Sequence, residues 1–260
     1  MLLQSICFYL IIRNKNFHQA GFINSTNKVA TSVNNIVSAV TEYISLKESN
    51  EALSRENAAL KTLMPDVFYI DSVQQRLVND TQLLQQYTFT PAKVINNSFN
   101  RRNNYLTLNK GTRHGIDTGM AVVNSSGVVG IVKNVSPHYS SVMSLLHKDT
   151  RLSARIKKNN YIGSIVWNDG VDPDRVTLND IARHVPVAKG DTIVTSSYSA
   201  IFPEGIMVGT VESIDQNSGM NFFKITVKLS TNFRNLTTVF VVNNLMKTEQ
   251  LQVQEGQVIE

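Results

Sequence analysis

The sequence predicts a mainly β protein, in which an N-terminal coiled-coil helix is followed by two small antiparallel β-barrel domains. Apolar residues recur with heptad spacing as far as Met64, which is typical of a coiled coil. From Pro91 onward that spacing is lost, and apolar and polar residues alternate, as in Lys224–Leu229. Short segments of this kind recur about every 8–12 residues, which favours antiparallel barrels or sandwiches.

Composition sets the limits of this prediction. The chain of 260 residues is 42% hydrophobic and 17% charged, which excludes a largely disordered protein. Its single cysteine, Cys7, excludes an intramolecular disulfide and a multi-cysteine metal site. The net charge of +5 comes from short basic steps without an interleaved aromatic platform, so we expect a solvated basic surface and no nucleic-acid partner.

The first fifteen residues contain an apolar run, Leu2–Ile12, which Arg13 and Lys15 interrupt. Eleven helical residues extend about 16 Å, roughly half of a hydrocarbon core of about 30 Å. We therefore expect residues 1–15 to be the outer part of a membrane anchor that starts upstream. The alternative is a buried or amphipathic N-terminal helix.

Residues 16–64 are predicted to form the coiled-coil helix. Leu46, Leu53 and Leu60 lie seven residues apart at d positions, and Asn50 and Asn57 occupy a positions. A buried amide at an a position favours an in-register dimer, so we expect a homodimer. The alternative is a helix packed on its own domain. The predicted dimer contacts are Val29, Ile36, Tyr43, Leu46, Asn50, Leu53, Asn57 and Leu60.

Pro65 ends this helix, and residues 65–90 are predicted to be a linker. We assign residues 91–150 to the first barrel, 151–245 to the second and 246–260 to a C-terminal tail. The first barrel could also take back the C-terminal strand. The predicted strand segments are 92–95, 105–109, 120–124, 128–135, 141–146, 152–157, 161–167, 175–178, 192–195, 205–214, 224–229 and 238–242.

An internal echo supports two barrels. Gly119–Val132 and Gly190–Val211 both run from glycine through a strand to a Ser-Ser turn and a second strand that carries Val-Gly-x-Val. The pattern indicates one hairpin used twice, with glycine where the wall must bend or pack closely. The alternative is a coincidence of hairpin sequences.

Motifs for catalysis or cofactor binding are absent from the sequence. No two of the five histidines have metal-ligand spacing, and no phosphate-binding glycine loop occurs, so we expect no metal, no cofactor and no enzyme activity. The alternative is a double-barrel serine protease. Its candidate residues are His147 as base, Asp149 or Asp180 to orient it, and Ser196 or Ser197 as nucleophile.

One loop suggests a binding surface. Tyr198, Ile201 and Phe202 lie in the insertion within the second hairpin, and Phe222 follows the next turn. Such residues either form a small satellite core or serve as anchors for a partner. We select these four as candidate partner contacts.

The order of these parts and the amino-acid sequences of several segments resemble the bacterial rod shape-determining MreC family. The resemblance is greatest to the Bacteroidetes members of that family. The segments that carry the resemblance are Pro91–Ser98, Asn103–Gly111, Gly119–Val123, Gly190–Ser197 and Ile201–Gly205. The likeness extends over essentially the whole chain and is most specific over residues 90–245.

The resemblance implies a single-pass inner-membrane protein whose bulk is periplasmic and whose double barrel is likened to chymotrypsin-type proteases without their active site. It implies a dimeric scaffold of the cell-elongation machinery. Its implied partners are MreD, MreB and a class B penicillin-binding transpeptidase, whose peptidoglycan synthesis it promotes to maintain rod shape. A competing interpretation is a membrane-fusion-type adaptor of an efflux or secretion system, but such an adaptor needs a second heptad run, which the sequence lacks.

Overall fold

A computed structural model describes residues 2–13, 44, 46–62, 68–70, 83–167, 172–215 and 221–255. It divides the chain into two compact units, residues 1–53 and 54–260. In the first unit, α1 (Leu2–Arg13) is a helix of 12 residues. No helix in these ranges is long and apolar enough to cross a membrane. Residues 46–62 are helical, as the heptad pattern predicts for that stretch.

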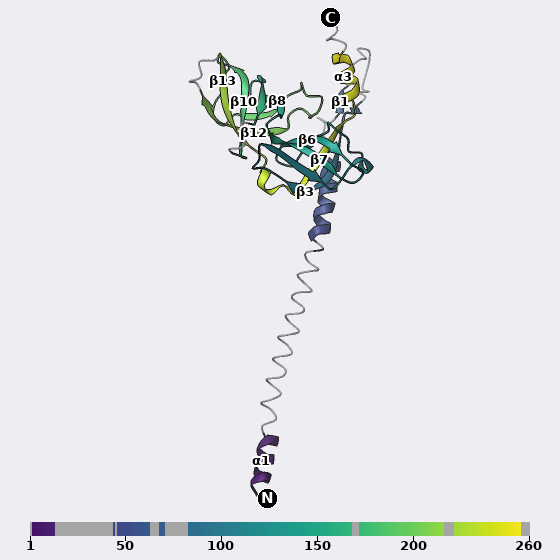
Figure 1. The fold of residues 1–260 in the computed structure, drawn as a ribbon, viewed down its shortest axis with the longest axis vertical. Coiled ribbons are helices and arrows are strands. Elements are labelled where there is room, and N and C mark those ends of the chain that lie inside the picture. The colour runs from purple at the N-terminus through teal and green to yellow at the C-terminus, as the bar shows by residue number, and fades with distance from the viewer. Residues whose placement is uncertain are drawn as a thin grey trace. The chain divides into compact units, whose positions relative to one another are not determined.

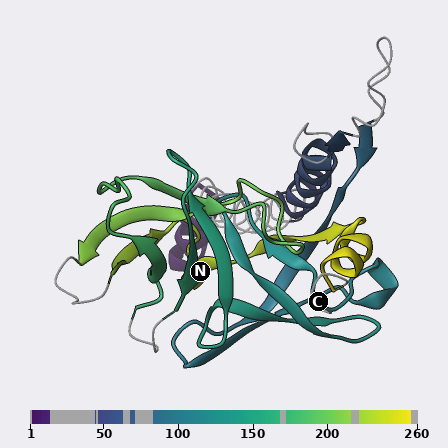
Figure 2. The same cartoon turned by 90° about the horizontal axis from the view of Figure 1, so that it is seen from above.

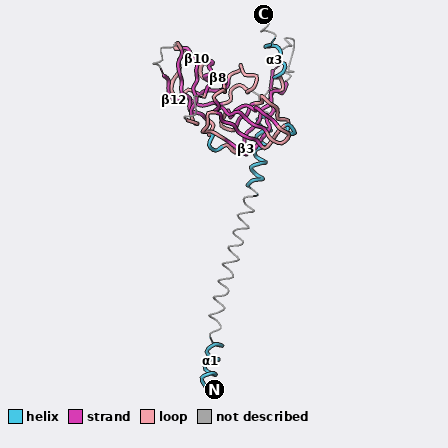
Figure 3. The backbone as a smooth tube through the Cα atoms, viewed as in Figure 1, coloured by secondary structure: helices cyan, strands magenta, loops and turns pink. Residues whose placement is uncertain are grey.

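Strands make up most of residues 83–244 (Figure 3). Each of the twelve predicted strand segments overlaps one strand of two closed barrels, so the predicted fold class is confirmed (Figure 1). The first barrel contains β3 (Tyr87–Asn97), β4 (Asn103–Leu108), β5 (Ala121–Val123), β6 (Val128–Val135), β7 (Ser140–His147) and β14 (Thr238–Asn244). The second contains β8 (Arg151–Ile156), β9 (Ile162–Val166), β10 (Arg175–Ala182), β11 (Thr192–Thr195), β12 (Met207–Asp215) and β13 (Phe222–Leu229).

The remaining described elements are short. Two strands, β1 (Phe68–Ile70) and β2 (Leu83–Gln85), pair antiparallel within the stretch predicted to be a linker. Single 3₁₀ turns, η2 (Thr112–His114) and η3 (Phe233–Asn235), connect strands. The helix α3 (Lys247–Glu255) occupies the predicted tail.

Alternation explains why these segments form barrels. Along β13, Ile225, Val227 and Leu229 are buried while Lys224 and Lys228 are exposed, so one face fills the barrel and the other contacts solvent. Closing each sheet on itself satisfies the strand edges that an open sheet would leave unpaired. Figure 2 shows the two barrels next to each other from above.

The domain boundaries agree with the prediction at one place and differ from it at two. The change of barrel falls between β7 and β8, near the predicted boundary at residue 150. However, β14 lies in the first barrel, where it pairs with β3 and β5, so the assignment of residues 238–244 to the second barrel is wrong and the option of a returned strand is right. The predicted linker also ends too late, because β3 begins at Tyr87.

The two barrels share one strand order. Read around each barrel, the orders are β14-β3-β4-β7-β6-β5 and β8-β9-β10-β13-β12-β11. They coincide strand for strand when β14 is matched to β8. The second barrel therefore repeats the topology of the first, with its first strand in the place that the chain's last strand fills in the first barrel.

The sequence echo maps onto this repeat. The hairpins β5–β6 and β11–β12 are equivalent, and each carries a register shift after its second residue pair. The second pairs are Val122 with Gly130 and Ile193 with Gly209. A Cβ atom on Gly130 or Gly209 would overlap with a carbonyl oxygen of the next strand. Glycine is thus required at the same place in both barrels because the neighbouring backbone comes too close for any side chain.

We predict that Gly209→Ala destabilises the protein by about 2–4 kcal/mol, because the new methyl group meets the fixed Lys228 carbonyl rather than a movable side chain. Urea denaturation would measure the loss. The control is Gly205→Asn, since Gly205 has φ +84 and open space around its Cβ position. Asparagine tolerates that conformation, so its cost should stay below about 1 kcal/mol. Equal stability of Gly209→Ala and the parent chain would contradict this account.

Candidate functional site

The helix of residues 46–62 has an exposed leucine at each described heptad d position. The exposed fractions of Leu46, Leu53 and Leu60 are 61%, 56% and 57%. Asn50 and Asn57, at the a positions, are exposed as well. The other predicted dimer contacts, residues 29, 36 and 43, lie outside the described residues.

Another face of this helix packs on the protein. Ala58 is buried and belongs to the hydrophobic core, and Ser54, Lys61 and Thr62 are partly buried. The Lys61 ammonium lies 5.8 Å from the ring centroid of Phe240 on β14, within range of a cation–π contact. The alternative of a helix packed on its own domain therefore describes the face that carries Ala58, and the leucines lie on a different one.

The loop between β11 and β12 is held by buried hydrogen bonds. Thr195 is fully buried, and its hydroxyl donates to the Pro203 carbonyl at 2.6 Å while it accepts from the Ile206 amide at 2.9 Å. Asn244 on β14 donates to the Ala200 carbonyl at 2.9 Å, which ties the loop to the first barrel. The loop conformation is thus fixed by both barrels.

The four candidate partner contacts differ in how exposed they are. Tyr198 is 76% exposed and Phe222 is 50% exposed, so both present aromatic surface to solvent. Ile201 is partly buried. Phe202 is only 2% exposed and belongs to the core, so the prediction that it is a surface anchor is wrong and the satellite-core alternative holds for it. The physical reason is that the Ser199 hydroxyl accepts from the Phe202 amide, which turns the chain inward.

The candidate protease residues do not form a relay. The imidazole Nδ1 of His147 accepts a hydrogen bond from the Asp149 amide at 3.1 Å, and its Nε2 is buried without a partner in the described structure. The hydroxyl of Ser196 is buried and bonds to the hydroxyl of Ser153 at 2.7 Å. A nucleophile needs the base within hydrogen-bond reach, but the Ser196 hydroxyl bonds to Ser153 and the Nε2 of His147 bonds to neither, so His147 and Ser196 do not form such a pair. The geometry gives the protease alternative no support.

The described residues contain no group of three or more His, Cys, Asp or Glu side chains that could hold a metal ion.

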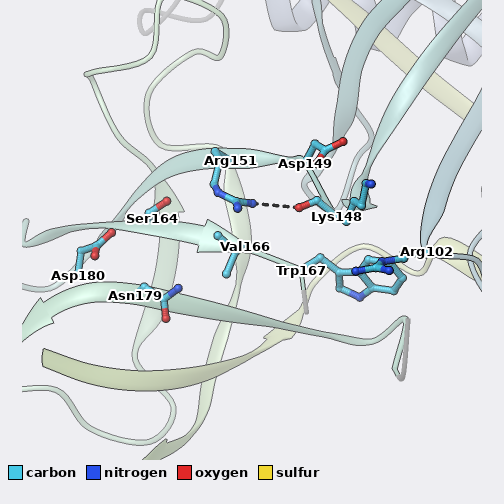
Figure 4. Close-up of a pocket in the computed structure, with 9 residues that line it drawn as sticks. All are labelled: Arg102, Lys148, Asp149, Arg151, Ser164, Val166, Trp167, Asn179 and Asp180. Carbon is cyan, nitrogen blue, oxygen red and sulfur yellow. Dashed lines mark hydrogen bonds between the residues drawn. The ribbon is translucent and has the colours of Figure 1, made fainter. Parts of the chain in front are cut away.

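A polar cavity of about 480 Å³ lies where the two barrels meet (Figure 4). The first barrel contributes Arg102, which precedes β4, and the Lys148-Asp149 pair that follows β7. The second barrel contributes residues of three adjacent strands, β8, β9 and β10, and Trp167. Its lining residues are Arg102, Lys148, Asp149, Arg151, Ser164, Val166, Trp167, Asn179 and Asp180.

No motif in the sequence marks this cavity. In the sequence, Arg102 and Arg151 belong to the short basic steps predicted to be solvated surface, and Asp149 and Asp180 are only protease candidates. The lining residues come from both barrels and from loops that no local motif joins. Only the register of β8, β9 and β10, together with the placement of the two barrels, brings them to one place.

The helical segment and the pair of six-stranded barrels of shared topology define a double-barrel protein with an N-terminal helix. Residues 94–243, more than half of the chain, match the family described as rod shape-determining protein MreC, barrel core. The chain therefore belongs to the MreC family, and the resemblance seen in the sequence is confirmed.

Individual relatives agree. The chain is 27% identical to the cell shape-determining protein MreC of Listeria monocytogenes over 193 residues, which cover 73% of this chain and 65% of that protein. It is 26% identical to the Bacillus subtilis protein over 226 residues, covering 83% of this chain and 76% of that one. The match to the Haemophilus influenzae protein spans 53% of its length. The chain thus spans between about a third and three quarters of the length of the relatives it matches.

Solved structures support the fold. The Listeria monocytogenes MreC structure is 25% identical with a TM-score of 0.56, and the match covers 79% of this chain and 92% of that one. The crystal structure of MreC from Pseudomonas aeruginosa, at 23% identity, has a TM-score of 0.56 over 59% of this chain and 98% of that one.

Burial of His147 makes the stability of the first barrel depend on pH. Desolvation lowers the pKa of the His147 imidazole below its ordinary value, Lys148 and Lys133 lower it further, and Asp149 opposes them. The unfolded chain therefore takes up this proton first, so stability should be complete above about pH 6.5 and fall as the pH drops below it.

Two measurements test this expectation. Urea denaturation between pH 7.5 and 5.5 should show a steeper loss of stability in the parent chain than in His147→Leu. An NMR titration of the parent imidazole gives the pKa directly and does not depend on how well the variant folds. A His147 pKa at or above the ordinary imidazole value would contradict the prediction.

Proposed function

We propose that this protein is a periplasmic, non-catalytic scaffold of the cell-elongation machinery, which positions peptidoglycan synthases and so maintains rod shape. The observation that carries the proposal is the match of the MreC barrel core to residues 94–243, which hold both barrels and the ordered loop that displays Tyr198. The Nδ1 of His147 and the hydroxyl of Ser196 already form hydrogen bonds within the protein, which fits a binding role better than hydrolysis.

The proposed scaffold is a homodimer joined through its helix. Leu46, Leu53 and Leu60 are exposed, and residues seven apart on a helix share one face. Three leucines in water leave apolar surface whose burial stabilises by about 25 cal/mol per Å². A second copy offers the same heptad spacing, so pairing of two helices buries both sets at once.

The proposed attachment to the inner membrane uses α1. Its described apolar side chains Leu2, Leu3, Ile6 and Tyr9 are all exposed, and none of its residues is acidic. Twelve helical residues extend about 18 Å, so α1 accounts for part of a bilayer crossing. MreD and MreB-type filaments are further proposed partners, as components of the cell-elongation machinery that this protein is proposed to serve.

The proposed enzyme partner is a class B penicillin-binding transpeptidase, and its proposed contacts are Tyr198 and Phe222. Large aromatic side chains held on a rigid frame are the residues that contribute most to protein–protein binding. Tyr198 fits because hydrogen bonds from both barrels fix its loop. The adaptor alternative is not favoured, because the family match is to the MreC barrel core.

Photo-crosslinking in the native cell tests the function. A photoreactive residue in place of Tyr198 should capture wall-synthesis enzymes, and one in place of Tyr139, an exposed tyrosine of the first barrel, serves as the control. Capture of transporter components instead of wall synthases would reject the scaffold proposal.

Replacing Leu46, Leu53 and Leu60 together with Asn should convert the dimer into a monomer, which analytical ultracentrifugation would detect. The control replaces Ala52 and Ala59 with Asn, since these exposed helical residues are also seven apart but occupy c positions. The control should stay dimeric. A monomeric parent chain, or dissociation of the control as well, would count against the leucine interface.

Tyr198→Ala should weaken binding to the purified periplasmic part of the transpeptidase by at least about tenfold, measured by biolayer interferometry. Tyr139→Ala is the matched control and should bind as the parent does. Phe202→Ala should instead lower stability, by about 3–5 kcal/mol, because it empties a core position. Unchanged binding by Tyr198→Ala would exclude this loop from the interface.

A further inference from the structure

The cavity between the barrels has one wall that strand register makes polar. Ser164 on β9 lies directly opposite Ser153 on β8 and Asn179 on β10. Residues directly opposite in antiparallel strands point to the same face, so these three side chains form a row across the outside of the second barrel. Ser164 and Asn179 line the cavity, whereas the Ser153 hydroxyl bonds to the hydroxyl of Ser196. The row therefore offers hydroxyl and amide groups to a bound molecule.

One side of the cavity is basic. The guanidinium of Arg151 donates to two backbone carbonyls, those of Lys148 at 3.1 Å and Thr150 at 3.0 Å. These bonds hold the group in place, but carbonyls do not neutralise its charge. Arg102 and Lys148 add two further cations on this side (Figure 4). A carboxylate of a ligand would meet a preformed cluster of donors here.

The other end of the cavity is acidic, and its backbone is strained. Asp180 has a φ of +68°, in the left-handed region that non-glycine residues rarely adopt. The register of β10 with β13 shifts between Leu178 and Ile181, so Asn179 and Asp180 form a bulge. Bulges and positive φ values of this kind cluster where a side chain is aimed at a ligand. In Figure 4, Asp180 lies at the opposite side from Arg102 and Lys148.

We propose that this cavity binds a short peptide that carries both a carboxylate and an amino group. The carboxylate would face Arg151, Arg102 and Lys148, the amino group would face Asp180, and Ser164 and Asn179 would bond to the peptide amides between them. The proposal goes beyond the scaffold function and does not depend on it.

Size and charge both select this class of ligand. A volume of about 480 Å³ suits a molecule of two or three amino acids. Three cations and two carboxylates line the cavity, so a polyanion would be repelled by Asp149 and Asp180. His147 does not neutralise Asp149, because the His147 Nδ1, 3.8 Å from an Asp149 carboxylate oxygen, accepts a hydrogen bond from the Asp149 amide and therefore carries no proton. A ligand with both charges matches both ends.

The only tryptophan of the chain, Trp167, lines the cavity, so its fluorescence reports on this site alone. The probe is the tripeptide Ala-Glu-Lys, titrated into the whole chain. We expect a saturable change with a dissociation constant between about 0.1 and 1 mM. A probe with its carboxyl groups converted to amides, Ala-Gln-Lys-amide, and a probe acetylated on both amines should each bind at least about tenfold more weakly.

Variants of the lining residues locate the binding. Arg151→Gln should weaken the tripeptide by about tenfold or more. Asp180→Asn should weaken it by about fivefold and should leave the fold intact, because asparagine tolerates a positive φ. The matched control is Arg113→Gln, an exposed arginine of the first barrel, which should bind as the parent does.

Amide chemical shifts of residues 151–153, 164–167 and 179–180 provide a second readout that does not depend on Trp167. No change in either fluorescence or shifts up to about 10 mM tripeptide would overturn the proposal. So would equal weakening by Arg113→Gln, which would mean that the basic surface attracts the peptide without a site. None of these outcomes bears on whether the protein dimerises or binds a transpeptidase, so the two proposals fail separately.

Discussion

The structure depends on the closure of the first barrel by its last strand. β14 pairs with β3 along Thr238–Asn244 and with β5 along Phe240–Val242, and without it β3 and β5 would be open edges. The strand that fills this gap comes about ninety residues after β7, so the whole second barrel is an insertion in the first. Both ends of the insertion are consequently fixed to the first barrel, one at β7 and the other at β14, and this limits where the second barrel can lie.

Contacts between the barrels follow from this insertion. The Thr231 hydroxyl, just after β13, donates to the Val128 carbonyl of β6 at 3.0 Å, and Asn244 donates to the Ala200 carbonyl of the β11–β12 loop. A Cβ atom on Gly127 would overlap with the Met207 carbonyl, so the backbones of two hairpins touch here. Tyr198 lies in the loop that Asn244 ties to the first barrel, and the polar cavity is lined by residues of both barrels. Their geometry is therefore a product of barrel closure, and neither belongs to a free loop.

How far the sequence predicts this arrangement depends on the range of each interaction. The strands are predictable because the alternation of apolar and polar residues is local. The repeat of the Gly119–Val132 pattern in Gly190–Val211 is visible in the sequence because close backbone approach requires glycine at Gly130 and Gly209. The barrel to which β14 belongs is not predictable in this way. Val239–Val242 is apolar on both faces, so its sequence does not indicate which strands it pairs with. Phe202 is misplaced for a similar reason, since an apolar residue in a loop looks the same whether it points in or out. The cavity has no sequence signal at all, because its walls meet only in three dimensions.

The helix of residues 46–62 has one face that packs on the barrel and another that carries exposed leucines. Phe240 on β14 is only 6% exposed, and the Lys61 ammonium of the helix lies 5.8 Å from its ring centroid, while Ala58 of the same helix is buried in the core. A small residue at Ala58 allows the helix to approach closely, whereas a leucine there would need space that the core does not have. The large apolar residues Leu53 and Leu60 lie on another face of the helix and are each more than half exposed. In the proposed dimer, fold stability and self-association therefore depend on different residues of one helix.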